Sequence, residues 1–476
     1  MTYQNSSPAD FIALGPWIIT AAAAVLVLLV LSFRRRHGLI LVLTLCGLAA
    51  AFFSLAVAAG QIPRPVGALF QVDGFALFYS GLILLLAFAV ALFAYGYLEG
   101  QQVRREEFYP LLLLGTLGAM VLSAGSHFAS FFLGLETLSV SLYVLIAYLV
   151  ARPGPVEAGL KYLILAGASS AFLLFGMALV YAASGTMLFS ELSRAEPSPM
   201  FLAGLGMMLV AAGFKLALVP FHLWTPDVYQ GAPAPAGAFI ATVSKGAMIA
   251  VLLRVFFDEG AITAEPVWWA LALPAFASML CGNLLALLQE NVKRILAYSS
   301  IAHFGYLMTA FLAARDLAVE TATFYLVGYC AATLAAFGVV TVLSEREREA
   351  ERFDDYRGLF WRRPALATVL TTALLSLAGI PLTVGFPGKF YLVAAGVDAS
   401  LWVLLFALLL GSAIGLFYYL RVIVVMFGEP PVTVAGALPV WSGAAVLLAV
   451  LTLVMLWLGV DPEPLIQLIR RIRIGA

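Results

Sequence analysis

The sequence has 476 residues, of which 63% are hydrophobic and only 11% are charged, and its mean hydropathy is +1.02. A soluble protein cannot bury that much apolar surface, so the composition predicts a polytopic membrane protein. Basic and acidic residues balance at 26 each, so the net charge indicates neither a nucleic-acid partner nor an anionic surface.

The chain begins with MTYQNSSPAD, which contains no basic residue, whereas Arg34, Arg35 and Arg36 follow the first apolar run. This order is the reverse of a secretory signal peptide. We therefore expect the first run to remain as a membrane helix with its N-terminus outside.

Apolar runs of spanning length recur along the whole chain, and a run of about 20 residues crosses a bilayer as a helix. They lie near residues 12–33, 38–59, 74–98, 108–126, 128–150, 159–184, 201–224, 235–257, 267–288, 294–314, 318–343, 365–396, 401–427 and 437–460. The pattern predicts an all-α membrane protein with about fourteen transmembrane helices. The run at 365–396 is long and contains GIPLTVGFPGK, so we expect a broken helix there.

Loop charges predict the topology. With the N-terminus outside, most basic loop residues fall on the cytoplasmic side: Arg34–Arg36, Arg104, Arg105, Arg152, Lys293, Arg294, Arg346, Arg348, Arg352, Arg357, Arg362, Arg363 and Arg421. The opposite loops contain only Arg64, Arg194 and Arg315, as the positive-inside rule requires. The tail is the exception, with Arg470, Arg471 and Arg473 outside, and we interpret it as an amphipathic interfacial or partner-contacting helix. The charged loop SEREREAERFDDYRG is expected to form a short solvated helix.

An internal repeat is visible in the architecture. Pro220 interrupts the seventh predicted helix and Pro381 the twelfth, 161 positions later (381 − 220). The same offset relates the fourth helix to the ninth, which predicts two five-helix units at residues 108–257 and 267–427. Since five is odd, the second unit is inverted, as in transporter folds with discontinuous helices. Residues 1–107 then form an N-terminal three-helix segment, and residues 428–476 form the last transmembrane helix and the tail.

The lysines carry the strongest functional signal. Only five are present, and Lys215, Lys245 and Lys389 lie well inside apolar segments. A buried lysine can lose its proton, whereas arginine keeps its charge in nearly any environment. Glu136 is the single acid near the middle of a predicted helix, where it needs a partner, and Lys161 and Lys215 are the candidates. A lone pair of this kind could be purely structural, but a carboxylate with several lysines favours proton transfer.

Other candidates have structural alternatives of equal or greater weight. Lys161 could extend to the interface, and His222 and Asp227 could cap the seventh helix. Arg254 is interpreted as extending to the outer interface. His303 and Tyr298 could line a hydrated path or simply satisfy each other.

Redox chemistry on this chain is not expected. Its three cysteines form no CxxC motif, its four histidines are scattered, and no glycine-rich phosphate loop is present. We therefore predict neither a cofactor nor a metal on this chain.

Four sequence blocks resemble the antiporter-like membrane subunits of respiratory complex I. They are FFLGLETLSVSLYVLIAY, FKLALVPFHLWTPDVYQGAPAPAGAFIATVSK, LLALLQENVKRILAYSSIAHFGYL and SLAGIPLTVGFPGKFYL, and the similarity extends from about residue 70 to 430. The form WTPDVYQGAP is closest to the N branch of that family rather than to the L or M branches.

The resemblance implies a fourteen-helix subunit with two inverted repeats that translocates protons, driven by electron transfer from NADH to quinone elsewhere in the complex. By motif, Glu136 and Lys215 match the glutamate and lysine that pair in the family. Lys161, Lys245 and Lys389 match lysines of the sixth, eighth and twelfth helices. The twelfth-helix motif departs from the family pattern at Pro387 and lacks a second proline, which puts the shape of the break in doubt.

The resemblance also implies partners and location. NADH, FMN, iron–sulfur clusters and quinone are expected in partner subunits, with M-type and K-type subunits as neighbours and L, A, J and H in the same complex. The expected location is a bacterial plasma membrane. Two alternatives stay open: a cation/proton antiporter subunit of an Mrp-type sodium-exporting complex, and a structural scaffold whose ion pairs only specify packing.

Overall fold

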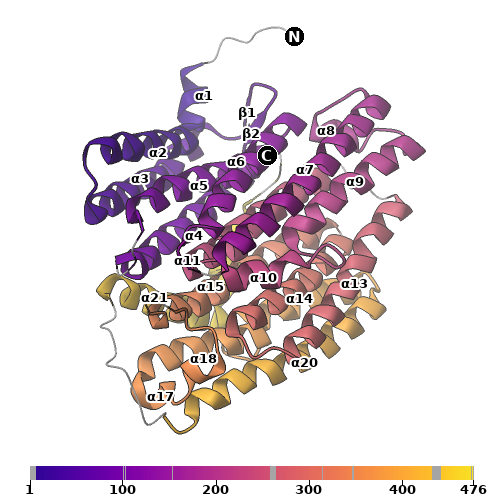
Figure 1. Ribbon diagram of the computed structural model, residues 1–476. Coiled ribbons are helices and arrows are strands. Elements are labelled where there is room, and N and C mark those ends of the chain that lie inside the picture. Colours follow the sequence, from indigo (N-terminus) through magenta and orange to yellow (C-terminus); the bar gives the residue numbers. More distant parts are fainter. Residues whose placement is uncertain are drawn as a thin grey trace.

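The computed structural model is a bundle of long helices with one short β-hairpin at one end (Figure 1). The structure describes residues 7–99, 101, 103–152, 154–257, 264–313, 315–345, 348–430, 441–472 and 474. Within these residues, thirteen helices are long and apolar enough to cross a membrane. The predicted all-α polytopic fold is therefore confirmed.

The N-terminal segment contains three spans and the hairpin. Its elements are α1 (Pro8–Ala13), α2 (Gly15–Phe33), α3 (His37–Ala58), η1 (Ala59–Gln61), β1 (Arg64–Val66), β2 (Phe70–Val72) and α4 (Gly74–Glu99). The strands are antiparallel, with Arg64 opposite Val72. Arg64 Nε donates to Asp10 Oδ1 at 2.5 Å, so an ion pair fastens α1 to the hairpin.

The first predicted five-helix unit follows. Its elements are η2 (Arg105–Glu107), α5 (Phe108–Ala124), α6 (Phe128–Ile146), α7 (Pro155–Ser184), α8 (Phe189–Leu192), α9 (Pro199–Leu216), α10 (Trp224–Gly231), α11 (Ala234–Phe239), the π-helical turn η3 (Ile240–Ser244) and α12 (Lys245–Phe257). The predicted seventh helix is thus divided into α9 and α10.

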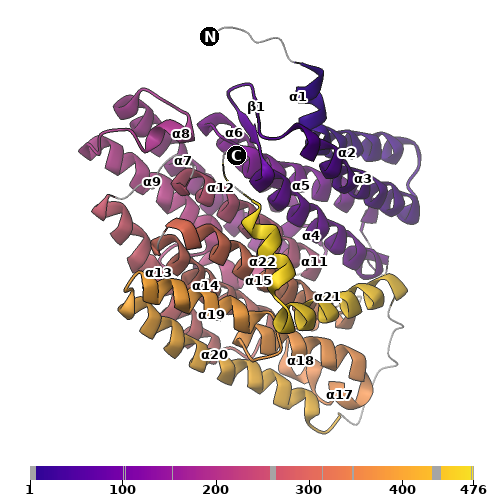
Figure 2. The same ribbon diagram turned by 180° about the vertical axis from the view of Figure 1, so that it is seen from behind.

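The second predicted unit lies beside the first (Figures 1 and 2). Its elements are α13 (Glu265–Leu287), α14 (Val292–Leu312), α15 (Arg315–Leu343), α16 (Phe353–Tyr356), α17 (Leu359–Arg362), α18 (Pro364–Ala378), α19 (Gly385–Asp398) and α20 (Trp402–Phe427). The predicted twelfth helix is divided into α18 and α19, which explains why thirteen rather than fourteen unbroken spans are found. The boundaries proposed for the units stay predictions.

Both interrupted helices end in the same way. Ala217 and Gly379 have left-handed backbones, with φ of 61° and 83°, and each directly follows a helix. The next amide closes the turn in each case, since Leu218 N donates to Gly213 O at 2.8 Å and Ile380 N donates to Leu375 O at 3.0 Å. These are Schellman caps at equivalent positions of the two units, and they support the inverted repeat.

The chain closes with α21 (Ser442–Val460) and α22 (Glu463–Arg470). Figure 2 shows α22 lying across the back of the bundle near α15. Its apolar side chains Ile466 and Ile469 are buried, and Arg470 Nε donates to Glu320 Oε1 at 3.2 Å. The tail is therefore a short amphipathic helix docked on the chain itself, while Arg473 lies outside the described residues.

Burial is very uneven among the spans. The span windows in Ala234–Phe257 and Val292–Leu312 are completely buried, whereas those in α3 and α21 are less than one third buried. The lysine-bearing α12 and its neighbour α14 therefore form the centre of the bundle, shielded from lipid by the other helices.

Two interpretations of charged residues are corrected. Arg254 does not extend to the interface: it is fully buried, and its guanidinium donates to both carboxylate oxygens of the equally buried Asp73, at 2.8 and 2.9 Å. The charged segment at 344–358 contains the expected short helix, α16, but among its described residues Glu349 is not solvated and turns inward to the buried Lys293. Both pairs join segments far apart in the sequence.

Candidate functional site

The first buried lysine lies at the end of α9, directly before the break in the helix. Lys215 is 3% exposed, and its ammonium donates to Ser139 Oγ at 2.8 Å and to the Tyr162 hydroxyl at 2.9 Å. The ammonium also lies 5.3 Å from the centre of the Tyr162 ring, within cation–π range. The α9 cap leaves its last carbonyls near this charge, which favours a cation there.

Glu136 lies on α6, one turn before Ser139. Its carboxylate is half-buried and accepts a hydrogen bond from Ser170 Oγ at 2.5 Å. Within the described part of the chain, no direct ion pair joins Glu136 to Lys215. The carboxylate is nevertheless close enough to act electrostatically on the lysine. The predicted contact pair is thus a pair of separately hydrogen-bonded charges, since each is bound by hydroxyl groups of its own.

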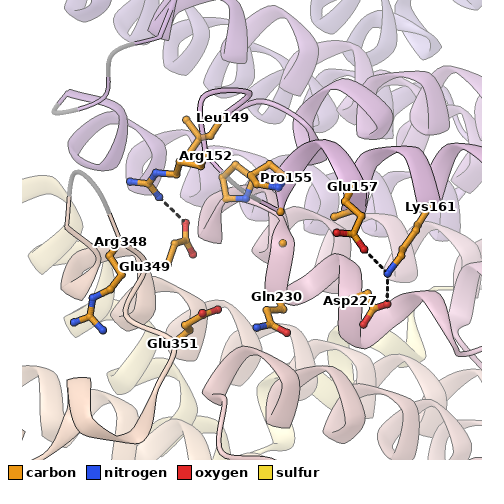
Figure 3. Close-up of a pocket in the computed structure, with 14 residues that line it drawn as sticks. Leu149, Arg152, Pro155, Glu157, Lys161, Asp227, Gln230, Arg348, Glu349 and Glu351 are labelled. Carbon is orange, nitrogen blue, oxygen red and sulfur yellow. Dashed lines mark hydrogen bonds and ion pairs between the residues drawn. The ribbon is translucent and has the colours of Figure 1, made fainter.

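Lys161 is not a partner of Glu136. It lies near the start of α7 with its side chain 44% exposed, and its ammonium is 2.8 Å from both Glu157 Oε1 and Asp227 Oδ2 (Figure 3). Asp227 also accepts from Arg294 Nη1 at 2.9 Å. Together they form a charge cluster that fastens α7 to α10 and α14 at the loop end of the helices.

Lys245 lies at the centre of the bundle. It is fully buried, and its ammonium donates to Ser300 Oγ of α14 at 2.6 Å and lies 4.6 Å from the Phe304 ring centre. The π-helical turn η3 ends immediately before it, and such turns occur frequently at functional sites. The Tyr329 hydroxyl donates to the same Ser300 oxygen at 2.7 Å, which starts a hydroxyl chain toward α15.

His303 lies one turn beyond Ser300 on α14. Its Nδ1 is 2.7 Å from the Tyr325 hydroxyl, and its Nε2 is 3.2 Å from the Tyr419 hydroxyl. Both Lys245 and Lys389 lie within electrostatic range of this imidazole. A ring that can donate at one nitrogen and accept at the other is suited to pass protons between the two lysines.

Lys389 is the fifth residue of α19, just after the second break. Its ammonium donates to the Ala378 carbonyl at the end of α18, at 2.8 Å, and lies 5.4 Å from the Tyr306 ring centre. The lysine thus neutralises the negative end of the preceding half-helix. Pro387 lies at the third position of α19, where a proline is tolerated because the first-turn amides have no partner within the helix.

The two remaining candidates are not brought into this network. His222 lies in the break after α9, and among the described residues its buried Nδ1 has no hydrogen-bond partner. Tyr298 is 9% exposed, and its hydroxyl makes no hydrogen bond within the described residues. Their parts in proton transfer stay predictions.

The sequence interpretation missed the hydroxyl groups that solvate the lysines. Ser139, Tyr162 and Ser300 accept from Lys215 and Lys245, and Tyr325 and Tyr329 extend these contacts to His303 and Ser300. Spacing could have revealed some of them, since Ser139 follows Glu136 by one helical turn and Ser300 precedes His303 by one turn.

Comparison with known proteins identifies the family. Residues 125–415 match the family model described as NADH:quinone oxidoreductase/Mrp antiporter, TM. The chain is 50% identical over 471 residues to NADH-quinone oxidoreductase subunit N of Ectopseudomonas mendocina, covering 96% of this chain and 95% of that protein. This chain belongs to the NADH-quinone oxidoreductase subunit N family. The subunit N protein of Methylococcus capsulatus is also 50% identical, over 463 residues, covering 96% of this chain and 94% of that protein.

Solved structures share the fold of this chain. A chain of respiratory complex I from Thermus thermophilus with bound aureothin is 35% identical with a TM-score of 0.83, covering 95% of this chain and 98% of that chain. A chain of the Mrp complex from Dietzia is 20% identical with a TM-score of 0.86, covering 98% of this chain and 97% of that chain. The latter likeness shows a shared fold alone. The predicted resemblance to complex I membrane subunits is therefore confirmed.

Proposed function

We propose that this chain is the proton-translocating N subunit of a bacterial NADH:quinone oxidoreductase. The observation that carries the proposal is the arrangement of the buried Lys245 and His303, each beside hydroxyl groups, with the half-buried Lys389, which donates to the Ala378 carbonyl. Charged groups at membrane depth are costly and usually mark ion pathways. Membership of the subunit N family indicates that this pathway is driven by electron transfer from NADH to quinone.

The proposed path runs from Lys245 to Lys389. A proton reaches Lys245 from the side predicted to be cytoplasmic, passes through the Ser300, Tyr329 and His303 groups, and leaves from Lys389 toward the outside. The break between α18 and α19 permits this because it frees a carbonyl, Ala378 O, to hold the Lys389 ammonium. Each pKa unit corresponds to about 1.36 kcal/mol, so modest changes in nearby charge can load and unload such lysines.

The Glu136 and Lys215 charges are proposed to control that loading. They are separately hydrogen-bonded rather than in direct contact, so either charge can change without breaking an ion pair. Lys161 is proposed to fasten α7 to α10 at the loop end of the helices, in the charge cluster with Glu157 and Asp227.

The chain is further proposed to depend on partner subunits for its electron-transfer chemistry. NADH, FMN, iron–sulfur clusters and quinone would bind in those subunits, with M-type and K-type subunits as neighbours. The proposed location is a bacterial inner membrane, with the N-terminus outside. An Mrp-type cation/proton antiporter is the second candidate; the 50% identity to subunit N proteins favours the first.

Arginine is the probe that tests the relay. Lys245→Arg and Lys389→Arg preserve the positive charge, but arginine does not release its proton. We expect both variant complexes to assemble and to pump at roughly a tenth of the wild-type rate or less, since positioned acid–base groups contribute about 10²–10⁴-fold. Proton pumping is measured in proteoliposomes with NADH and quinone.

Lys161→Arg is the matched control, because an ammonium shared by two exposed carboxylates asks only for a positive charge. That variant should pump at close to the wild-type rate. Wild-type pumping by both the Lys245→Arg and Lys389→Arg complexes would overturn the proposed relay.

A further inference from the structure

A polar cavity of about 380 Å³ opens at the loop end of the bundle, on the side predicted to be cytoplasmic. It lies between the start of α7, the helix α10 and the loop residues Arg348, Glu349 and Glu351 (Figure 3). Charged side chains line it from all sides, among them Arg152, Glu157, Lys161, Asp227, Arg348 and Glu349. A cavity of this size and polarity holds water, so it brings the aqueous phase to the wall of the bundle.

Glu349 forms the inner wall of this cavity and is only 13% exposed. Its Oε2 accepts from Lys293 Nζ at 2.6 Å, and Lys293 itself is fully buried. Its Oε1 accepts from the Tyr97 hydroxyl and from the backbone amide of Ala234 at 3.2 Å, and lies 3.7 Å from Arg152 Nη1. The carboxylate thus faces water on one side and the buried core on the other.

These contacts place Glu349 at the start of α11 and at the start of α14. Ala234 is the first residue of α11, which leads to Lys245, and Lys293 lies in the first turn of α14, which carries Ser300. Lys293 and Ser300 are seven residues apart and share one face of α14, about 10 Å apart along the axis at 1.5 Å per residue.

The end of α10 contacts both Lys293 and Ser300. The Ala232 carbonyl, which follows α10, accepts from Lys293 Nζ at 2.6 Å, while the Tyr229 hydroxyl on α10 is 3.5 Å from Ser300 Oγ. The same segment therefore contacts Lys293 at the cavity side and Ser300, which holds the Lys245 ammonium, at the inner side.

We propose that Glu349 is the acceptor through which protons from the cytoplasmic side enter this subunit, with Lys293 as the group that passes them inward to Lys245. A hydronium ion in the cavity gives its proton to the Glu349 carboxylate and leaves as water. Lys293 releases a proton toward Ser300 and neutral Lys245, and the protonated Glu349 carboxyl then returns one to the Lys293 amine. Glu349 is again a carboxylate, and one proton has moved inward. This inference rests on the proposed proton-translocating function.

The test replaces Glu349 by glutamine, which keeps its shape but cannot carry the proton. In the assembled complex, Glu349→Gln should lower the quinone-reducing turnover with NADH roughly tenfold or more, measured with a protonophore present so that no gradient limits the rate. Glu349→Asp keeps a carboxylate and should retain at least half of the turnover. Glu351→Gln is the matched control, because Glu351 lines the same cavity from the same loop without touching Lys293.

Formate separates proton entry from a merely structural role. A small weak acid can enter the cavity and deliver protons in place of the missing carboxyl group, so millimolar formate should restore much of the turnover of Glu349→Gln. Wild-type turnover of Glu349→Gln would overturn the proposal, as would a loss that formate does not restore or a failure of the variant to assemble. The relay variants distinguish this proposal from the proposed function. If Lys245→Arg and Lys389→Arg lose pumping while Glu349→Gln does not, only the entry site is wrong.

Discussion

At the scale of single residues, Lys215 and Lys245 donate to hydroxyl groups rather than to opposite charges. A lysine in a tight ion pair is held in its charged form, whereas an ammonium that donates to Ser139, Tyr162 or Ser300 can become a neutral amine with the same partners. A buried arginine stays charged and has a structural role instead. Arg254 forms a bidentate ion pair with Asp73, and both residues are fully buried. Breaking such a pair costs about 3–5 kcal/mol, so it fastens α4 to α12.

The first residue-scale prediction concerns Glu136. Glu136→Gln removes the charge but keeps a group that can accept from Ser170, so the complex should assemble. Loss of the negative charge leaves Lys215 without its electrostatic partner, and we expect coupled electron transfer and proton pumping to fall together, several-fold, in proteoliposomes. Thr137→Val, one residue further along α6 and half-buried, is the control and should be neutral. Normal pumping by assembled Glu136→Gln would remove this residue from the mechanism.

At the scale of elements, the two interrupted helices satisfy their freed backbone groups within the protein. Val219 N in the first break donates to Ser278 Oγ at 2.8 Å, and Val384 N in the second donates to the Met455 carbonyl at 2.9 Å. Such partners are required because an unsatisfied backbone group in the membrane costs several kcal/mol. The breaks are therefore defined conformations rather than loose segments, and they hold Lys215 and Lys389 in fixed places.

A glycine in the second break offers an element-scale test. A Cβ on Gly385 would lie 1.7 Å from the Ser376 carbonyl oxygen of α18, so Gly385→Ala must push α19 away and move Lys389 from Ala378 O. Overpacking typically costs 1–3 kcal/mol, and we expect a lower thermal midpoint and slower pumping. Gly167→Ala is the matched control, since no atom lies within 4 Å of its added Cβ. Equal melting and pumping of the two variants would show that the break tolerates displacement.

At the scale of the whole molecule, the bundle keeps its charged centre away from lipid. The spans that carry Lys245 and Ser300 are completely buried, and the spans around them expose large apolar side chains. The protein is a multi-pass membrane protein of the subunit N family, and its relatives are named as subunits of an oxidoreductase. A subunit of this kind converts a change made elsewhere into proton movement.

Purification tests the proposal that the chain depends on partner subunits for its electron-transfer chemistry. Gentle detergent extraction of the native membrane should recover the chain in an assembly that contains flavin and iron–sulfur proteins, detected by absorbance and by mass spectrometry. A harsh detergent that strips those proteins should abolish NADH-driven pumping, and the remaining chain should not exchange protons alone. Recovery of an active, cofactor-free monomer or homodimer would contradict the prediction.

The sequence alone determined the membrane class, the spans, the two breaks and the burial of Lys215 and Lys245, whereas it placed the buried Lys293 in a loop. The reason is physical: burying a charge or interrupting a helix in a bilayer is so costly that each exception, such as Lys245 or Pro220, stands out against its apolar neighbours. Only the tertiary structure decided which groups meet these exceptions. Asp73 and Arg254 are 181 residues apart, and Glu349 reaches Lys293 from a loop whose composition indicated a solvated helix. Serine and tyrosine hydroxyls occur on most of the helices, so packing alone selects those that contact a lysine.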